Sequence, residues 1–159
     1  MDRPPSPADR DAARTVVVTW LQTTVAENPV VEAAGPDVDE PDRRWYVRVR
    51  GDDKDVWTLW FTLDQRTLAY ETHVLAAPDE NHAAFYEQLL RRNHGLFGPS
   101  FCIGAEDAVF LTGQLAIAHI DDDALDHVLG SVYAAIEQSF RALLRVGFAT
   151  RLAALEDRS

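Results

Sequence analysis

The chain has 159 residues, of which 47% are hydrophobic and 26% charged, a composition typical of a globular protein rather than a disordered one. Its formal net charge of -11 repels phosphate backbones and anionic lipids, which argues against nucleic acids and membranes as partners. A single cysteine excludes an internal disulfide framework, and the longest apolar run is too short to span a membrane. We therefore expect a single domain over residues 1–159. Because the first residues lack a signal-peptide pattern, we expect it to be cytoplasmic.

The N-terminal part predicts a helix followed by a surface connection. Ser6 can cap a helix whose first position suits Pro7, and apolar residues then recur at helical spacing until Asn28. Residues 28–42 are rich in Pro, Asp and Glu, and they predict a surface connection with room for a short extended piece at Val30–Val31.

Three runs that alternate apolar and polar residues follow, at 45–50, 57–63 and 68–74. The short turns between them predict an antiparallel meander, and the period of two assigns each side chain to a face. Nine side chains are expected to face the core: Trp45, Val47, Val49, Trp57, Leu59, Phe61, Leu68, Tyr70 and Val74. Eight are expected to face the other way: Tyr46, Arg48, Arg50, Thr58, Trp60, Thr62, Glu71 and His73.

The second face of this predicted sheet is a candidate binding surface. Tyr46 and Trp60 would lie there beside Arg48 and Arg50, and aromatic residues and arginine are favoured at interface hot spots. The equal alternative is that a terminal helix covers this face.

Glu71 and His73 share that face at roughly 7 Å, because they are two residues apart on one strand. This spacing would suit acid–base chemistry or half of a metal site, but it equally describes the solvated side of any sheet. The sequence offers no third ligand, so we predict no metal.

The polar stretch that begins at Asp79 predicts a helix rather than an active site. Asp79 can cap a helix that starts at Glu80, and Gly95 can close it in the left-handed conformation. His82 and His94 would be about 18 Å apart along its axis, too far for a joint metal site.

The last third predicts a second hairpin and a long helix. Residues 100–103 and 108–111 flank a turn, and 114–117 can prolong the second strand. Asp121–Asp123 are better explained by capping than by cation binding, and the helix should continue to about Leu152. The expected order is helix, three strands, helix, two strands, helix: an α+β domain with a mainly antiparallel five-stranded sheet.

No nucleotide-binding, zinc-protease or serine-hydrolase motif occurs in the chain. Cys102 lies within an apolar strand, where a lone cysteine behaves as a small hydrophobic residue more often than as a nucleophile. We therefore predict no catalytic residues and no cofactor.

The ordered segments resemble the YbjN family, whose members are described as bacterial sensory-transduction regulators. The segments that carry the resemblance are 57–63, 65–68, 77–82, 86–93 and 107–111, within a match from about Trp45 to Phe148. The resemblance implies the α+β fold of type III secretion chaperones, with protein binding or regulation rather than catalysis and commonly a homodimer. It brings no catalytic residues.

Two hypotheses follow from these observations. The first is a non-enzymatic protein-binding or regulatory module, chaperone-like, whose partner protein would contact Tyr46, Arg48, Arg50, Trp60, Glu71 and His73. The alternative is a small-molecule-binding domain or an undetected enzyme, with a pocket near Glu71, His73 and Arg48.

Overall fold

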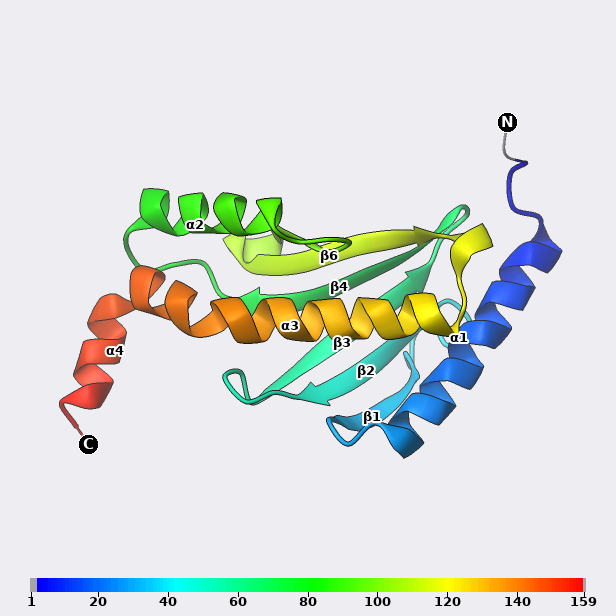
Figure 1. Ribbon diagram of the computed structural model, residues 1–159, viewed down its shortest axis with the longest axis horizontal. Helices are drawn as coiled ribbons and strands as arrows, with labels where there is room; N and C mark the ends of the chain where they lie inside the picture. Colours follow the sequence, from blue (N-terminus) through cyan, green and yellow to red (C-terminus); the bar gives the residue numbers. More distant parts are fainter. Residues whose placement is uncertain (1–2, 159) are drawn as a thin grey trace.

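The alternating segments form one antiparallel sheet of six strands in the computed structural model, which describes residues 3–158. The spatial order is β1-β2-β3-β4-β6-β5, so β1 and β5 are the two edges (Figure 1). The strands are β1 (Val31–Pro36), β2 (Arg44–Arg50), β3 (Val56–Leu63), β4 (Thr67–Leu75), β5 (Ser100–Ile103) and β6 (Val109–Ala116). The meander β2-β3-β4 and the β5-β6 hairpin are as predicted.

The prediction of five strands was wrong, because β1 lies within residues 28–42, which were expected to be a surface connection. Its sequence, VEAAGP, does not alternate, and only Val31 is buried. An edge strand of this kind is defined by its backbone pairing with β2, for example Ala34 opposite Val47, and not by its side chains. Proline is tolerated at such an edge.

The helices are α1 (Pro7–Glu27), α2 (His82–His94), α3 (Asp122–Gly147) and α4 (Ala149–Glu156), with 3-10 turns η1 (Ala105–Asp107) and η2 (Ile117–His119). The predicted cap of α1 is confirmed: the Ser6 side chain accepts the Asp9 backbone N–H, and the Asp9 carboxylate accepts that of Ser6. At α3, Asp121 likewise accepts the Ala124 backbone N–H at 2.8 Å.

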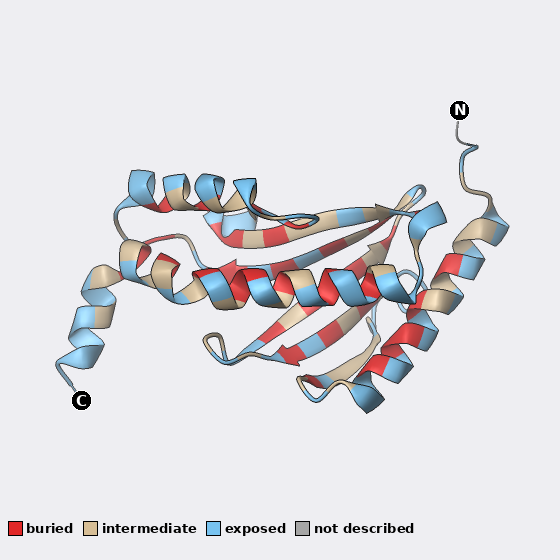
Figure 2. Ribbon diagram, in the orientation of Figure 1, coloured by how far each residue is buried: buried red, intermediate tan, exposed pale blue. Residues whose placement is uncertain are grey.

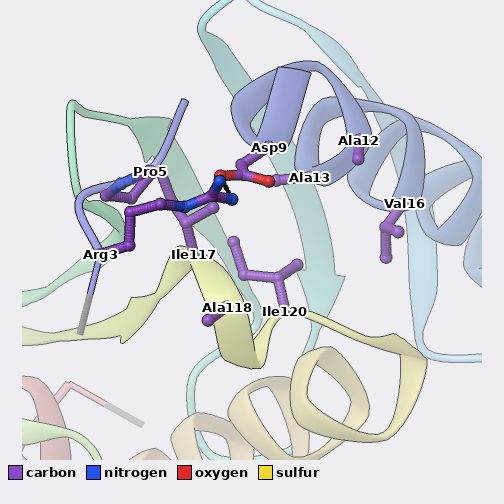
Figure 3. Close-up of a pocket in the computed structure, with 9 residues that line it drawn as sticks. All are labelled: Arg3, Pro5, Asp9, Ala12, Ala13, Val16, Ile117, Ala118 and Ile120. Carbon is purple, nitrogen blue, oxygen red and sulfur yellow. Dashed lines mark hydrogen bonds and ion pairs between the residues drawn. The ribbon is translucent and has the colours of Figure 1, made fainter. Parts of the chain in front are cut away.

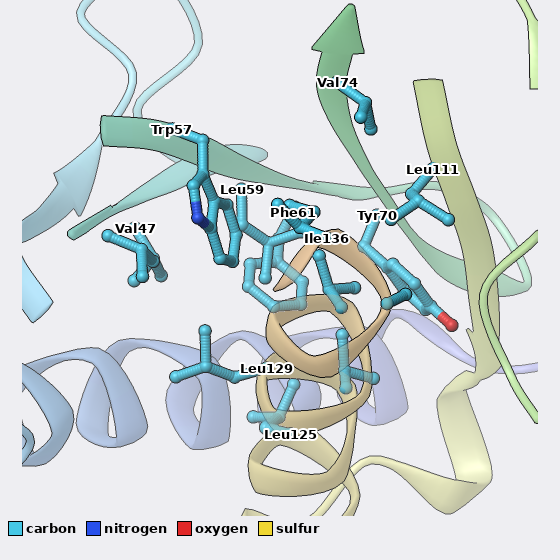
Figure 4. Packing of buried hydrophobic residues seen from close by; sticks show 14 of the residues in the cluster. Val47, Trp57, Leu59, Phe61, Tyr70, Val74, Leu111, Leu125, Leu129 and Ile136 are labelled. Carbon is cyan, nitrogen blue, oxygen red and sulfur yellow. The ribbon is translucent and has the colours of Figure 1, made fainter. Parts of the chain in front are cut away.

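The hydrophobic core lies between the sheet and the helices. In Figure 1, α1 and α3 cross one face of the sheet, and α2 packs beside α3 at the β5 end. In Figure 2, buried and less buried positions alternate along the central strands. Figure 4 shows Leu125, Leu129 and Ile136 of α3 among side chains of β3 and β4, and the Trp20 ring of α1 meets Phe61 edge-on at 5.8 Å. All nine residues predicted to face the core are buried.

The ends of α2 differ from the prediction. The helix begins at His82, two residues later than expected, and Asn81 holds the capping position in the left-handed region without a side-chain cap. Asp79 instead accepts a hydrogen bond from the Arg151 guanidinium at 2.8 Å. Gly95 has φ -93°, so the predicted left-handed closure is also wrong.

The predicted long C-terminal helix is in fact two helices, because the chain bends at Phe148. The carbonyl of Gly147 accepts the backbone N–H of Glu80 at 3.2 Å. The Glu80 carboxylate then accepts the backbone N–H of Thr150 at 2.7 Å and its hydroxyl at 3.1 Å, and so caps α4. The break is therefore stabilised by the loop between β4 and α2, which is remote in sequence.

Candidate functional site

The sheet face opposite α1 and α3 carries the two aromatic residues expected there. Tyr46 and Trp60 face each other across the β2–β3 pair with ring centroids 5.8 Å apart, and both are half-buried. Within residues 3–158 no helix packs on this face, since α1 lies on the other side and α4 points away from the sheet (Figure 1). The face assignment is thus confirmed, and the alternative of a covering terminal helix is wrong for the described residues.

The arginine that stacks on Trp60 is Arg44, which sequence reasoning missed. Its guanidinium carbon lies 3.9 Å from the centroid of the Trp60 ring, within the range of a cation–π contact. It also pairs with Asp37 at 3.4 Å and, at the limit of contact, with Glu71 at 3.9 Å. Extending the alternation of β2 by one residue would have placed Arg44 on this face.

Arg48 and Arg50 lie on the same face, two and four residues along β2 from Tyr46. Both pair with Glu32 on β1, at 3.3 and 2.7 Å, and these hydrogen bonds, that of Arg50 foremost, lower the pKa of Glu32. Their charges are therefore already partly compensated within the chain.

A depression of about 400 Å³ opens beside Trp60. It brings Glu71 and His73 together, as predicted, but Arg48 does not line it. The His73 ring meets that of Phe110 edge-on at 5.4 Å. The depression is lined by Arg44, Lys54, Val56, Trp57, Thr58, Trp60, Glu71, His73 and Phe110.

The depression lies where β3 and β4 separate. Their register pairs run from Leu63–Leu68 to Trp60–Glu71. Beyond that point side chains act as donors to backbone carbonyls: the Thr72 hydroxyl donates to the carbonyl of Thr58 at 2.7 Å, and the Lys54 ammonium donates to that of Val74 at 3.0 Å. We call this region the β3–β4 split.

Lys54 is the only lysine of the chain, and it is half-buried at the β3–β4 split. Burial lowers the pKa of its ammonium group. Burial also lowers the pKa of His73, and the nearby charge of Lys54 lowers it further, so the neutral imidazole is favoured there. Lys54 lies in the β2–β3 turn, which contains none of the predicted site residues.

Across the described part of the chain, no three His, Cys, Asp or Glu side chains gather as ligands for a metal ion. His82 and His94 are exposed at opposite ends of α2, and Cys102 contacts the Thr112 hydroxyl at 3.7 Å. None of the helices in residues 3–158 is long and apolar enough to cross a bilayer.

A second cavity, of about 340 Å³, lies between the N-terminal segment, α1 and η2 (Figure 3). Its walls are mainly apolar and include Val16 and Ile120. The charged groups in the wall are Arg3 and Asp9, which form an ion pair at 3.3 Å. The Asp9 carboxylate is already engaged in capping α1, and none of the predicted site residues lies here. This cavity therefore presents little free polar chemistry.

The order of strands and helices defines an α+β domain with helices on one face of an antiparallel six-stranded sheet. A family profile described as "Putative bacterial sensory transduction regulator" matches residues 28–145. The chain belongs to the YbjN family, which confirms the resemblance seen in its sequence segments.

Two mycobacterial proteins are similar to this chain in sequence. The chain is 37% identical over 87 residues to the uncharacterized protein ML2442 of Mycobacterium leprae, and 36% identical over 87 residues to the uncharacterized protein Rv0487 of Mycobacterium tuberculosis. Each match covers 55% of this chain and 47–48% of the relative, so the chain spans about half the length of the curated relatives it matches.

Among solved structures, the chain is similar to the Yersinia pestis type III secretion chaperone SycH, crystallised in complex with a stable fragment of YscM2. The identity is 20% and the TM-score 0.47, and the match covers 76% of this chain and 98% of that one. No functional conclusion follows from a match at this level.

Proposed function

We propose that this protein is a non-enzymatic protein-binding module of a regulatory or chaperone-like kind, and that the open sheet face is its docking surface. The observation that carries the proposal is the stack of Tyr46, Trp60 and Arg44 on a face that no helix covers within residues 3–158. Aromatic residues and arginine supply most of the binding energy at protein interfaces.

The partner that suits this surface is an acidic or amphipathic segment of another protein. The chain as a whole has a net charge of -11, yet Arg44 and Lys54 line the depression beside the aromatic pair. Complementary charge speeds encounter and selects among partners, so the locally basic surface favours acidic segments. A second copy of this acidic chain is a less suitable occupant, and light scattering tests it.

The depression next to Glu71 and His73 supports a second candidate function, binding of a small molecule. Its volume of about 400 Å³ falls in the lower range of ligand sites. Replacing His73 with alanine would then abolish binding of that molecule, whereas it should weaken a docked protein segment only modestly.

The first prediction concerns Trp60. A peptide-display library selected on the wild-type protein should yield ligands that bind Trp60→Ala about 30-fold more weakly, the equivalent of about 2 kcal/mol for a hot-spot aromatic. The dissociation constants are measured by calorimetry, and circular dichroism checks that the variant is folded.

The matched control is Phe97→Ala. Phe97 is 82% exposed in the loop between α2 and β5, so its loss should leave the same peptides bound. Tyr46→Ala provides a second variant should Trp60→Ala fail to fold. Peptides that bind both face variants as tightly as the wild type, or that depend on Phe97, would rule out this docking surface.

A further inference from the structure

Lys54 is a half-buried cation for which residues 3–158 supply no acidic partner. Nearly all of the described ion pairs are made by arginines with the chain's abundant carboxylates. Within residues 3–158, no Asp or Glu oxygen lies within 4.0 Å of the Lys54 ammonium, although the chain has 26 acidic residues. Its contacts are the Val74 carbonyl at 3.0 Å and the Phe140 ring, whose centroid is 5.3 Å away.

The turn that carries Lys54 is held in place by α3. The Glu137 carboxylate accepts the backbone N–H groups of Asp52 and Asp53, each at 3.0 Å, and Arg141 pairs with the Asp53 carboxylate at 2.9 Å. A Cβ at Gly51 would overlap the backbone carbonyl oxygen of Lys54 and lie 2.7 Å from the Glu137 carboxylate, so glycine is required for this close approach. Lys54 is thereby positioned before any partner binds.

Other cations on the face are already engaged. Arg44 is shared between Asp37 and Glu71, while Arg48 and Arg50 share Glu32. A half-desolvated charge without a counter-charge is costly, and a bound anion would offset that cost. Lys54 is therefore the cation on this face best placed to attract an external carboxylate.

We propose that Lys54 receives the carboxylate of an Asp or Glu side chain of the docked segment, while a neighbouring apolar residue of that segment packs on Trp60 and Phe110. This inference rests on the proposed function and specifies its partner: an extended acidic segment with an apolar residue next to the acid. Trp60 and Lys54 line the same depression, so one segment can contact both.

The probe is a set of hexapeptides with blocked ends, each with one Trp or Leu and one Glu separated by zero to three residues. Every peptide has a counterpart in which Gln replaces Glu. The best Glu peptide should bind the wild-type protein about 10-fold more tightly than its Gln counterpart, a ratio that falls in high salt.

Lys54→Met and Lys54→Gln should reduce this ratio to about one; glutamine retains a hydrogen-bond donor, which separates loss of charge from loss of the Val74 contact. Arg91→Met is the matched control, because Arg91 is a cation on α2, away from the sheet face and already paired with Glu87, and it should leave the ratio unchanged.

A direct readout comes from the uniqueness of the lysine. Reductive methylation with ¹³C-formaldehyde labels Lys54 alone among side chains, and its signal should shift with the Glu peptide but not with the Gln peptide or with free acetate at the same concentration. An equal shift with acetate would assign the site to small anions and overturn the proposal.

The Trp60 and Lys54 variants distinguish failure of this inference from failure of the proposed function. If Trp60→Ala weakens both peptides and the Lys54 variants keep the Glu-over-Gln ratio, the docking surface stands and the role of Lys54 is refuted. If the Lys54 variants abolish the ratio while Trp60→Ala changes nothing, the anion site stands and the aromatic docking surface is refuted. Equal or absent binding of Glu and Gln peptides by the wild-type protein overturns the inference.

Discussion

Two glycines in opposite surroundings allow a test of packing at the scale of single residues. A Cβ at Gly113 on β6 would overlap both the hydroxyl oxygen and the ring carbon Cζ of Tyr70, whereas one at Gly130 on α3 would meet nothing within 4 Å. We expect Gly113→Ala to lower the free energy of unfolding by about 1–3 kcal/mol through overpacking. Gly130→Ala should raise it by about 1 kcal/mol, because alanine favours the helix. Urea denaturation measures both.

The Gly113 result has its own internal check. Tyr70→Leu removes both the hydroxyl and the ring carbons that a Cβ would strike, so Gly113→Ala should cost less stability in the Tyr70→Leu background than in the wild type. A loss that is the same in both backgrounds would show that the overlap is not its cause.

At this scale the sequence predicted Tyr46 and Trp60 on the second face, because alternation along a strand is a local property. It gave no sign of Lys54, because the interest of that residue arises from the separation of β3 from β4 and from the clamp formed by Glu137. Both are contacts between segments distant in sequence.

Among the elements, α4 depends on a carboxylate supplied by another segment. The hydrogen bond from the Thr150 backbone N–H, followed by that from its hydroxyl, lowers the pKa of Glu80 below its ordinary value of 4.5. The stability that this interaction contributes is therefore fully present above pH 4.5 and is lost as the pH falls through the lowered pKa. Glu80→Gln should be less stable than the wild type at pH 7, with the difference shrinking below pH 4.5 in urea titrations. A difference that does not vary with pH would contradict this role.

The histidines of α2 provide a test of the helix as a structural element. His82 and His94 are exposed at its two ends, so His82→Ala and His94→Ala should each cost at most about 1 kcal/mol and leave peptide binding unchanged. Calorimetry with zinc checks the competing interpretation: tight binding abolished by either change would make this stretch a metal site.

The elements also differ in how far the sequence could predict them. Helical spacing and strand alternation of apolar residues can be read within a single segment, so the elements that show these patterns were predicted from the sequence. The edge strand β1 and the break at Phe148 were missed, because the first depends on pairing with β2 and the second on the docking of Glu80 against Gly147 and Thr150.

For the whole molecule, the decisive feature is that α1 and α3 pack on one face of the sheet and leave the other open (Figure 1). The sequence could not choose between an open and a covered face, since the path of a helix across a sheet is set by packing contacts such as Trp20 on Phe61.

The short seam between β3 and β4 has a consequence for motion. β2 pairs with β3 along all of Arg44–Arg50, but β4 pairs with β3 only along Trp60–Leu63. The sheet therefore consists of two three-stranded blocks joined along half of β3, and opening of that seam would separate the blocks without breaking the pairing inside either one. A segment that contacts both Trp60 and Lys54 would hold the two blocks together. Amide hydrogens along the seam would then exchange more slowly with solvent, because the seam would open less often.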